Sequence, residues 1–537
     1  MVAPGGRGVT APDVLVVGAG PTGLALALQA HDHGARVRVV ERRTEVFRPS
    51  RALMLHVRTL ELLRPLGVTG ELLARADTAP EARLHLGRRV VPVRLAGLDL
   101  PDTAFPHLTF VRQADVESVL ADALAERGVG VERGTELVDV TDLGPVARAR
   151  LATPASTEEV DCPAVAGCDG VESTVRARAR IGWRGGTYDR EVVLADVDGT
   201  GPLAPGVAHV VAGRRGLLFL FALGEGAPWR LLATRPVTAP ALPPGRPGPR
   251  VPREVLQALV DEAGLPFRVT DVPWSSAVRL QHRVATTFRR GRLFLAGDAA
   301  HASSPAGGQG MNTGLHDAAG LGWRLALAPG SRDPDLLLGS YDAERRPAAH
   351  RVLALTHLLF WAESGTGPVP SALRGSLAPL AAPAVPLVLG RRRLVAEAFR
   401  VLAQLRAGAR GSPLSAEGAA RRTRGPRAGD RLPDAAVVRD GRERRLHELL
   451  ARPGVHVLLD RDAPVPGSAV AGPRVSVHRL DRPGAGLVAV RPDGLVGYRS
   501  ARVDADELGD WLSLVGAGPA PRVGAERSAA GAAPADG

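Results

Sequence analysis

The chain has 537 residues, which is too long for one ordinary domain, and 45% of them are apolar while 23% are charged, which excludes disorder throughout. Its net charge is +12, and all 68 positive residues are arginine. These arginines are spread along the chain, without a basic block that interleaves aromatic residues, so we expect no nucleic-acid partner. A positive surface would still help to capture an anionic dinucleotide.

The two cysteines and the hydropathy pattern further limit the class of protein to which the chain can belong. Cys162 and Cys168 have five residues between them, which is the spacing of neither a CxxC pair nor a four-ligand metal site, so we expect reduced thiols and no metal. The N-terminal residues lack a signal-peptide pattern. The nearest approach to a membrane span, Leu377–Gly390, is short and contains three prolines. We therefore expect a cytoplasmic protein without a membrane partner.

The first part of the chain alternates strands and helices. A buried strand is expected at Asp13–Val17, a helical run at Leu24–Ala30 and a second strand at Ala35–Glu41. Further helices are expected at 59–73 and 116–127, and an apolar strand at 165–169. From residue 185 to 281 the sequence pattern changes to Val/Leu/Phe-rich strands separated by Gly/Pro turns, which predicts an antiparallel sheet.

After residue 281 the sequence again shows a pattern of alternating strands and helices. A buried strand is expected at 292–296, helices at 311–328 and 336–361, and helical character near 385–410. Residues 413–431 have the composition of a linker. Strands at 455–459, 475–478 and 487–490, with a helix at 504–514, then predict a small α/β unit before an Ala/Gly/Pro-rich tail.

The first motif is Gly-Ala-Gly-Pro-Thr-Gly, residues 18–23, between the first strand and the first helix. Gly18 can adopt a tight turn, Gly20 lets the backbone approach a pyrophosphate, and Gly23 lets the helix pack on the strand. Glu41 ends the second strand, where its carboxylate would accept hydrogen bonds from ribose hydroxyls. The spacing indicates a dinucleotide-binding unit whose helix N-terminus faces the phosphates.

The second motif is Gly-Asp-Ala-Ala-His at 297–301, followed by Pro305 and the glycine-rich run 307–313. The preceding strand delivers Asp298 to its carboxyl end, where open α/β sheets bind ligands. A helix that begins near Met311 would direct its N-terminus at the pyrimidine end of a flavin. Asn312 is the one asparagine in the chain. His301 is expected to pack under this loop.

Together these motifs carry a family resemblance. The first motif with Glu41, the Asp169-Gly170 pair, and the second motif resemble the class A flavoprotein monooxygenases, which include relatives of para-hydroxybenzoate hydroxylase and phenol hydroxylase and, most closely in pattern, the aromatic polyketide hydroxylases of actinomycetes. The resemblance runs from about residue 12 to 360.

The resemblance implies FAD as cofactor and assigns residues to it. Arg51 corresponds to the family's arginine near the pyrophosphate, Gln113 to its ribityl-binding glutamine, and Asp169-Gly170 to a motif shared between FAD and NAD(P)H. Arg51 could equally be a surface arginine, Gln113 a helix-start residue and Asp169-Gly170 an ordinary turn. The implied cofactor-binding set is Gly18, Gly20, Gly23, Glu41, Arg42, Arg51, Gln113, Asp169, Gly170, Asp298, Pro305, Gly308, Gln309, Gly310, Met311 and Asn312.

The same resemblance implies an α/β fold with a Rossmann-like FAD-binding domain, an antiparallel-sheet substrate domain and a C-terminal thioredoxin-like domain. Because that last unit contains no cysteine, thiol–disulfide chemistry is excluded there. The expected boundaries are 12–184 with 282–385 for the discontinuous FAD-binding domain, 185–281 for the substrate domain, 386–426 for a helical segment and linker, 427–516 for the thioredoxin-like domain and 517–537 for a disordered tail.

The implied reaction takes hydride from NADPH or NADH and O₂ to form a C4a-hydroperoxyflavin, which hydroxylates an aromatic, polycyclic polyketide-type substrate. No side chain declares itself as a catalytic base. His209, Arg230, Trp274 and Arg279 are candidates to line the substrate site. Baeyer–Villiger oxidation on the same scaffold and a redox-silent flavin- or drug-binding protein are the alternatives, and a homodimer is left open.

Overall fold

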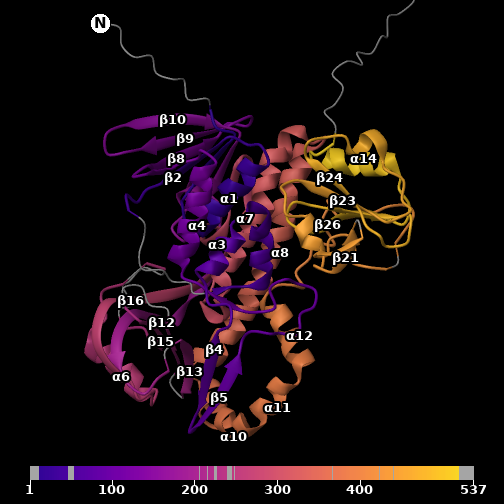
Figure 1. Cartoon of the computed structure of the whole chain (residues 1–537). Helices are drawn as coiled ribbons and strands as arrows, with labels where there is room; N and C mark the ends of the chain where they lie inside the picture. The colour runs from indigo at the N-terminus through magenta and orange to yellow at the C-terminus, as the bar shows by residue number, and fades with distance from the viewer. Residues whose placement is uncertain are drawn as a thin grey trace, which may run out of the picture.

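The computed structural model has a mixed α/β fold and ends in a separate α/β unit (Figure 1). It describes residues 11–45, 54–204, 206–213, 216–222, 227–238, 245–246, 248–365, 367–422, 424–439 and 441–518. Arg51 and residues 519–537 of the expected tail lie outside this part of the chain.

The first sheet is the six-stranded nucleotide sheet, in the order β17-β18-β11-β1-β2-β7. Its central strands pair in parallel and are rich in Val, Leu and Ala, because both faces are covered. Helices α1 (Pro21–Asp32), α4 (Gln113–Glu126) and α7 (Gln309–Leu327) pack against one another beside it. Its strands are β1 (Val14–Val17), β2 (Val37–Glu41), β7 (Val131–Arg133), β11 (Ala164–Gly167), β17 (Arg289–Arg290) and β18 (Leu293–Leu295).

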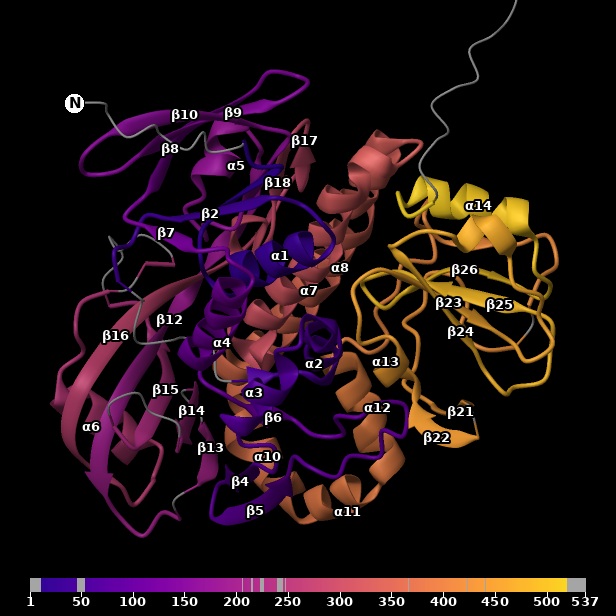
Figure 2. The same ribbon diagram turned by 45° about the horizontal axis from the view of Figure 1, so that its top comes forward.

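Shorter elements complete this part of the molecule. The helix expected at 59–73 is broken in two, since Pro65 lies within it. An antiparallel three-stranded sheet lies beside the nucleotide sheet (Figure 2). The elements are β3 (Met54–Leu55), α2 (Val57–Leu63), η1 (Arg64–Leu66), α3 (Thr69–Ala74), β6 (Thr109–Phe110), β8 (Glu136–Asp142), β9 (Ala147–Ala152), β10 (Thr157–Cys162) and α5 (Thr174–Arg178).

The second large sheet has eight strands in the order β19-β16-β12-β15-β14-β13-β4-β5. Its two longest strands, β12 (Trp183–Thr200) and β16 (Arg268–Ala285), pair along most of their length. The sheet extends beyond the expected 185–281, because β4 and β5 join it from residues 81–94 and β19 joins from the second motif. The other members are β4 (Glu81–Leu86), β5 (Arg89–Arg94), β13 (Val207–Gly213), β14 (Gly216–Phe221), β15 (Trp229–Pro236) and β19 (His301–Ala302), with α6 (Arg253–Glu262) alongside.

A helical region links the two sheets to the C-terminal unit. Helix α8 (Pro334–Ser364) is capped by the Asp333 carboxylate, which accepts from the Leu336 amide. After it, Pro368–Gly390 forms a chain of five short helical pieces, four of which have proline in the first turn. The elements are η2 (Gly297–Ala299), η3 (Ala306–Gly308), η4 (Ala328–Gly330), α9 (Pro368–Ala372), η5 (Leu373–Leu377), α10 (Ala378–Ala381), η6 (Ala382–Ala384), α11 (Val385–Gly390) and α12 (Arg392–Leu402).

By length and composition, Pro368–Gly390 is apolar enough to cross a membrane, unlike the shorter Leu377–Gly390 that the sequence alone brings forward. Only 11% of its most apolar window is buried in the protein. The helical stretch is longer than expected because its prolines stand at helix starts, where they are tolerated.

The C-terminal unit is built on a five-stranded sheet in the order β20-β26-β25-β23-β24. A parallel pair, β23 with β24, is followed by the antiparallel β25–β26 hairpin and then by α14, whose N-cap is Asp504. The elements are β20 (Ala416–Glu417), β21 (Ala436–Arg439), β22 (Arg442–Arg445), α13 (Leu446–Leu449), β23 (Val455–Leu459), η7 (Gly467–Val470), β24 (Val475–Arg479), β25 (Leu487–Val490), β26 (Val496–Ser500) and α14 (Ala505–Leu514).

Candidate active site

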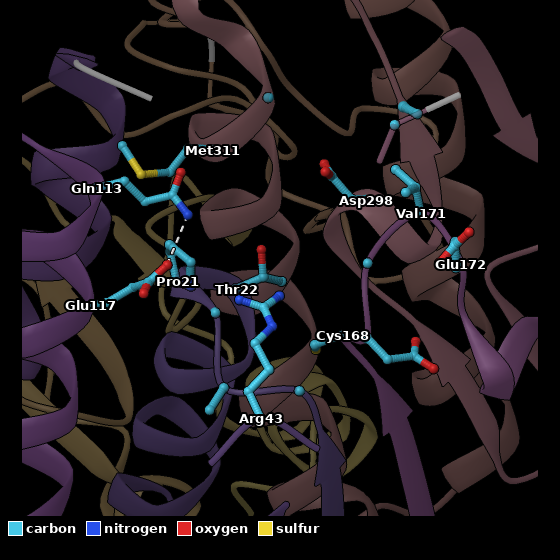
Figure 3. Close-up of a pocket in the computed structure, with 18 of the residues that line it drawn as sticks. Pro21, Thr22, Arg43, Gln113, Glu117, Cys168, Val171, Glu172, Asp298 and Met311 are labelled. Carbon is cyan, nitrogen blue, oxygen red and sulfur yellow. Dashed lines mark hydrogen bonds between the residues drawn. The ribbon is translucent and has the colours of Figure 1, made fainter. Parts of the chain in front are cut away.

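A cavity of about 540 Å³ lies between the nucleotide sheet and the eight-stranded sheet, and both sequence motifs open into it (Figure 3). In Figure 3, Gln113 and Met311 lie on one side of the space, and Asp298 with Val171 on the other. Of the expected cofactor residues that the structure describes, those lining the cavity are Gly18, Gly20, Glu41, Arg42, Gln113, Asp169, Gly170, Asp298, Pro305, Gly308, Gly310 and Met311.

The glycine loop at the start of α1 is constrained by close backbone packing. Gly18 has φ +103°, and a Cβ there would lie 2.4 Å from the Cys168 carbonyl oxygen. A Cβ on Gly23 would lie 1.9 Å from the Gly18 carbonyl oxygen, so Gly23 serves helix packing and does not line the cavity. A Cβ on Gly20 would meet no atom within 4 Å. The loop is thus closed toward the protein and open toward the cavity at Gly20, where a phosphate can approach.

Glu41 is fixed at the carboxyl end of β2. One carboxylate oxygen accepts from the Ala19 amide at 3.0 Å, and the other accepts from the Arg43 amide at 3.0 Å. The first bond ties the strand end to the glycine loop. Each oxygen keeps a second lone pair for a ribose hydroxyl. Arg43, which lines the same part of the cavity, places its Nε 3.7 Å from the carboxylate.

Gln113, at the first residue of α4, is paired with a residue that sequence reasoning missed. Its side-chain amide donates to Glu117 Oε1 at 2.8 Å (Figure 3). Glu117 also lines the cavity, and burial raises the pKa of its carboxyl to about 7. The signal for Glu117 was available: residues i and i+4 of a helix share a face, so Glu117 lies on the face of Gln113.

The Asp169-Gly170 turn leaves one carboxylate oxygen without a partner. Asp169 Oδ2 accepts from the backbone amides of Thr174 at 2.7 Å and Val175 at 3.2 Å, at the start of α5. Asp169 Oδ1 is buried and has no hydrogen-bond partner among the described residues. Burial raises the pKa of this carboxyl. An unpaired buried oxygen of this kind can accept a hydrogen bond from a bound ligand.

Arg176 links that turn to the second motif. Its guanidinium donates to the carbonyl oxygens of Ala299 at 2.9 Å and Val171 at 2.7 Å, and it lies 4.1 Å from the Trp183 ring centroid. Arg176 is 9% exposed. Its guanidinium therefore makes its contacts inside the protein, and its hydrogen bonds hold the two loops in place relative to each other.

Asp298 is exposed to the cavity on a loop that is anchored from beneath. Gly297 before it has φ +61°. The anchor is Asp317 of α7, which is fully buried. Its carboxylate accepts hydrogen bonds from the Gly297 amide at 3.0 Å and from Arg345 Nε at 2.7 Å, and it lies 2.6 Å from His301 Nε2. His301 therefore packs under the loop and is not a lining residue.

Two residues of the expected set have side chains that face the protein interior. Asn312 Oδ1 accepts from the His56 amide at 2.8 Å and the Thr59 hydroxyl at 2.6 Å, and its amide group donates to the carbonyl oxygens of Met54 and Gly308. Gln309 is fully buried and donates to the Leu402 carbonyl oxygen at 2.7 Å. Both shape the loop around the cavity and contact a ligand, if at all, through the backbone.

The far wall of the cavity is one face of the eight-stranded sheet. Val192 and Leu194, alternate residues of β12, line it, and so do the consecutive residues 278–281 of β16, beside an irregularity in the β12–β16 pairing. The apolar lining residues are Val192, Leu194, Phe221, Leu232, Val278 and Leu280. Arg279 and Gln281 add polar groups.

Only Arg279 of the four substrate-lining candidates is part of this wall. Arg230 is fully buried and pairs with Asp196 at 2.6 Å, with Trp274 stacked 5.6 Å away. His209 is buried and lies 3.1 Å from His85 Nε2. Their positions within the sheet explain the difference, because a sequence pattern does not tell which face of a strand is covered.

These features fit FAD. Gly20 is open to a phosphate, Glu41 retains lone pairs for a ribose, and Asp169 Oδ1 lacks a partner within the described part of the chain. Arg42, Arg43 and Arg133 supply positive charge along the same half of the cavity, which suits an anionic dinucleotide. Among the described residues no group of three or more His, Cys, Asp and Glu side chains is arranged to hold a metal.

Comparisons with known protein families agree with this geometry. The family model described as "FAD binding domain" matches residues 11–356, and the one described as "Aromatic-ring hydroxylase, C-terminal" matches residues 425–517. The first match contains every residue that lines the cavity, and the second covers most of the C-terminal unit.

Individual relatives are monooxygenases and hydroxylases. The chain is 36% identical over 376 residues to a 6-methylpretetramide 4-monooxygenase of Streptomyces rimosus, a match that covers 69% of this chain and 64% of that relative. The anhydrotetracycline hydroxylase OxyS from Streptomyces rimosus superposes with a TM-score of 0.74 at 29% identity, covering 95% of this chain and all of that one. The structure of a ternary complex of aklavinone-11 hydroxylase with FAD and aklavinone superposes with a TM-score of 0.71 at 25% sequence identity. The match covers 94% of this chain and 98% of that one.

Proposed function

Since the chain belongs to the FAD-binding, aromatic-ring hydroxylase family of flavin-dependent monooxygenases, we propose that its own substrate is a polycyclic, polyketide-type aromatic compound, which it hydroxylates with NADPH or NADH and O₂ in the cytoplasm. The observation that carries the proposal is the lining of the cavity between the nucleotide sheet and the eight-stranded sheet: dinucleotide-binding motifs lie on one side and an apolar sheet face on the other.

The apolar wall suits a planar fused-ring substrate. Six Val, Leu and Phe side chains from four adjacent strands line it, so a flat hydrophobic face would be covered over its length. Arg279 and Gln281 are placed to orient the hydroxyl or carbonyl groups of such a compound. A small single-ring substrate would leave much of this wall uncovered.

The residues described here would hold the cofactor and position it. Glu41 and the glycine loop would bind its ADP half, Gln113 and Asp298 the ribityl chain, and the loop at Gly308 and Gly310 the ring. When bound, the flavin supplies the redox chemistry, taking electrons from the nicotinamide and activating O₂. The protein excludes water by enclosing the substrate between the loop and the sheet.

The C-terminal unit follows the strand order of a thioredoxin-like domain, which is our interpretation of its fold. It contains no cysteine, and among its described residues none lines the cavity. We assign it a structural role.

The experiment is a screen of phenolic and polycyclic quinone compounds for stimulated NAD(P)H consumption, followed by product mass after reaction under ¹⁸O₂. We expect a fused-ring compound to stimulate consumption and to gain one ¹⁸O on the ring. NAD(P)H consumption that no aromatic compound stimulates, or an ester product from ring expansion, would contradict the proposal.

A substitution in the wall tests the placement of the substrate. Val278→Trp would fill part of the cavity from β16, so we expect it to retain FAD while losing stimulation by the substrate at least about tenfold. Val438→Trp, on the exposed β21 at 46% exposure, is the matched control and should behave as wild type.

A further inference from the structure

The helical segment Pro368–Gly390 lies at the end of the molecule opposite the nucleotide sheet (Figure 1), and only 11% of its most apolar window is buried. Leu373, Leu377, Leu380 and Leu387 recur at helical spacing, and they are 41%, 57%, 75% and 74% exposed. From residue 375 to 390 the sequence contains no charged side chain. A contiguous apolar face of this size on a protein surface marks an interaction site.

The inner side of the segment is firmly attached to the protein. Arg374 is 5% exposed and donates to the carbonyl oxygens of Gly213, Ala362 and Gly365. Ala382 is buried in an apolar cluster with Leu86 and Val91 of the β4–β5 hairpin. The segment is therefore held flat against the eight-stranded sheet, and it cannot cross a bilayer without leaving that sheet.

Positive charge follows directly after the apolar face. Arg391, Arg392 and Arg393 are all exposed at the start of α12. Between Glu363 and Glu397 the chain carries four arginines and no acidic residue. The surface thus combines exposed leucines with three arginines that form no ion pair with any residue in the described part of the chain, since Glu397 on the same helix pairs with Arg400 and Arg406.

We propose that this face docks on the surface of an anionic lipid bilayer, with the leucines inserted at the boundary between headgroups and acyl chains and Arg391–Arg393 on the lipid phosphates. A helix that exposes leucines beside a basic cluster binds in the interfacial plane by both contributions. A second copy of this chain is the less favourable occupant, because its matching segment brings the same arginines and no acidic residue. The surface lies outside the cavity, so the proposal does not depend on the substrate.

The test is cosedimentation of the full-length, FAD-loaded protein with vesicles of phosphatidylglycerol and phosphatidylcholine, against vesicles of phosphatidylcholine alone. We expect binding to the anionic vesicles that weakens as salt is raised. Leu380→Glu with Leu387→Glu should reduce that binding at least about tenfold, and the neutralising triple change Arg391→Gln, Arg392→Gln, Arg393→Gln should do the same. FAD absorbance and NAD(P)H oxidation report that each variant is folded.

The matched control variant is Val438→Glu with Arg442→Gln and Arg444→Gln, which alters an exposed valine and two exposed arginines on β21 and β22. It should bind vesicles as wild type does. Absence of binding by the wild-type protein, or equal binding by all variants, overturns the proposal. So does a dimer by light scattering that the Leu380→Glu, Leu387→Glu variant converts to a monomer without any vesicle binding, since a second copy would then occupy the face.

Discussion

At the residue scale, Asp298 is exposed to the cavity, and the loop that carries it is anchored from beneath through Asp317. We expect Asp298→Ala to weaken FAD binding by about 2 kcal/mol, or roughly thirtyfold in Kd, by removing hydrogen bonds to a charged acceptor. The Kd is measured by fluorescence titration of the FAD-free protein. Asp99→Ala, exposed and outside the cavity, is the control; full FAD retention by Asp298→Ala would refute the role.

Glu117 gives a pH-dependent prediction. Burial raises its pKa from 4.5 to about 7, so the folded protein holds an extra proton between those values. The resulting stability is present below about pH 4.5 and is lost as the pH rises through 7. Glu117→Gln, which stays neutral, should therefore stabilise the FAD-free protein by about 1–2 kcal/mol at about pH 8.5 and have little effect at about pH 5.

Thermal unfolding at the two pH values measures this difference. Glu126→Gln changes an exposed carboxyl on the same helix and should show no such pH dependence. A gain from Glu117→Gln that is equal at both pH values would show that the titration of Glu117 is not its cause.

Individual site residues were predictable where backbone geometry dictates the residue type. The positive φ of Gly18 and the position of Glu41 at the end of β2 were predictable, because a tight turn and a strand-end carboxylate leave marks in the sequence, and their cofactor roles stay predictions. Asn312 and Gln309 were assigned to the cofactor from their motif, whereas their side chains bond to Met54 and Leu402, far away in the chain. Sequence proximity to a motif does not reveal which way a helical side chain points.

At the scale of elements, strands and helices with a clear apolar period were found with small shifts of their ends. The segment 455–459 matches β23, and 504–514 matches α14 with Asp504 as its cap. The partnership of β4 with β13 could not be foreseen, because it joins residues 81–85 to 207–211 and depends on packing rather than local pattern. β26 was missed since its five residues include glycine and arginine.

A buried ionic network joins α7 and α8 to the β25–β26 turn and gives a prediction at this scale. Glu344 pairs with Arg324 and Arg491, each at 2.7 Å, and Asp493 completes the network. Burial raises the pKa of Glu344, but the two guanidinium charges outweigh it and lower the pKa to about 2. Glu344→Ala would leave two buried guanidinium groups with Asp493 as the one remaining carboxylate of the network, and should destabilise the protein by about 3 kcal/mol or more.

Chemical denaturation measures that loss, with Glu254→Ala as the control because Glu254 is 74% exposed in its side chain. A change of less than about 1 kcal/mol for Glu344→Ala would mean that the network is solvated in solution.

At the scale of the whole molecule, the C-terminal unit covers surfaces that cannot face water without cost. Trp323 is fully buried and donates to Asp493 at 3.3 Å, and Arg431 pairs with Glu61. We expect truncation before Gly425 to lower soluble yield and melting temperature while leaving the rate of flavin reduction per bound FAD close to that of the full chain. A truncated protein that is fully stable yet cannot reduce its flavin would contradict this assignment.

The interleaving of the two sheets has a consequence for synthesis on the ribosome. The cradle for the dinucleotide begins at Gly18, but its neighbours Cys168 and Asp298 lie on loops that follow β11 and β18. Parallel strands so far apart in sequence pair only after the intervening chain has emerged. We therefore expect the nascent protein to bind FAD only after the chain well past residue 298 has emerged. Until then the apolar faces of β1 and α1 stay exposed. FAD would then stabilise a fold that has already assembled.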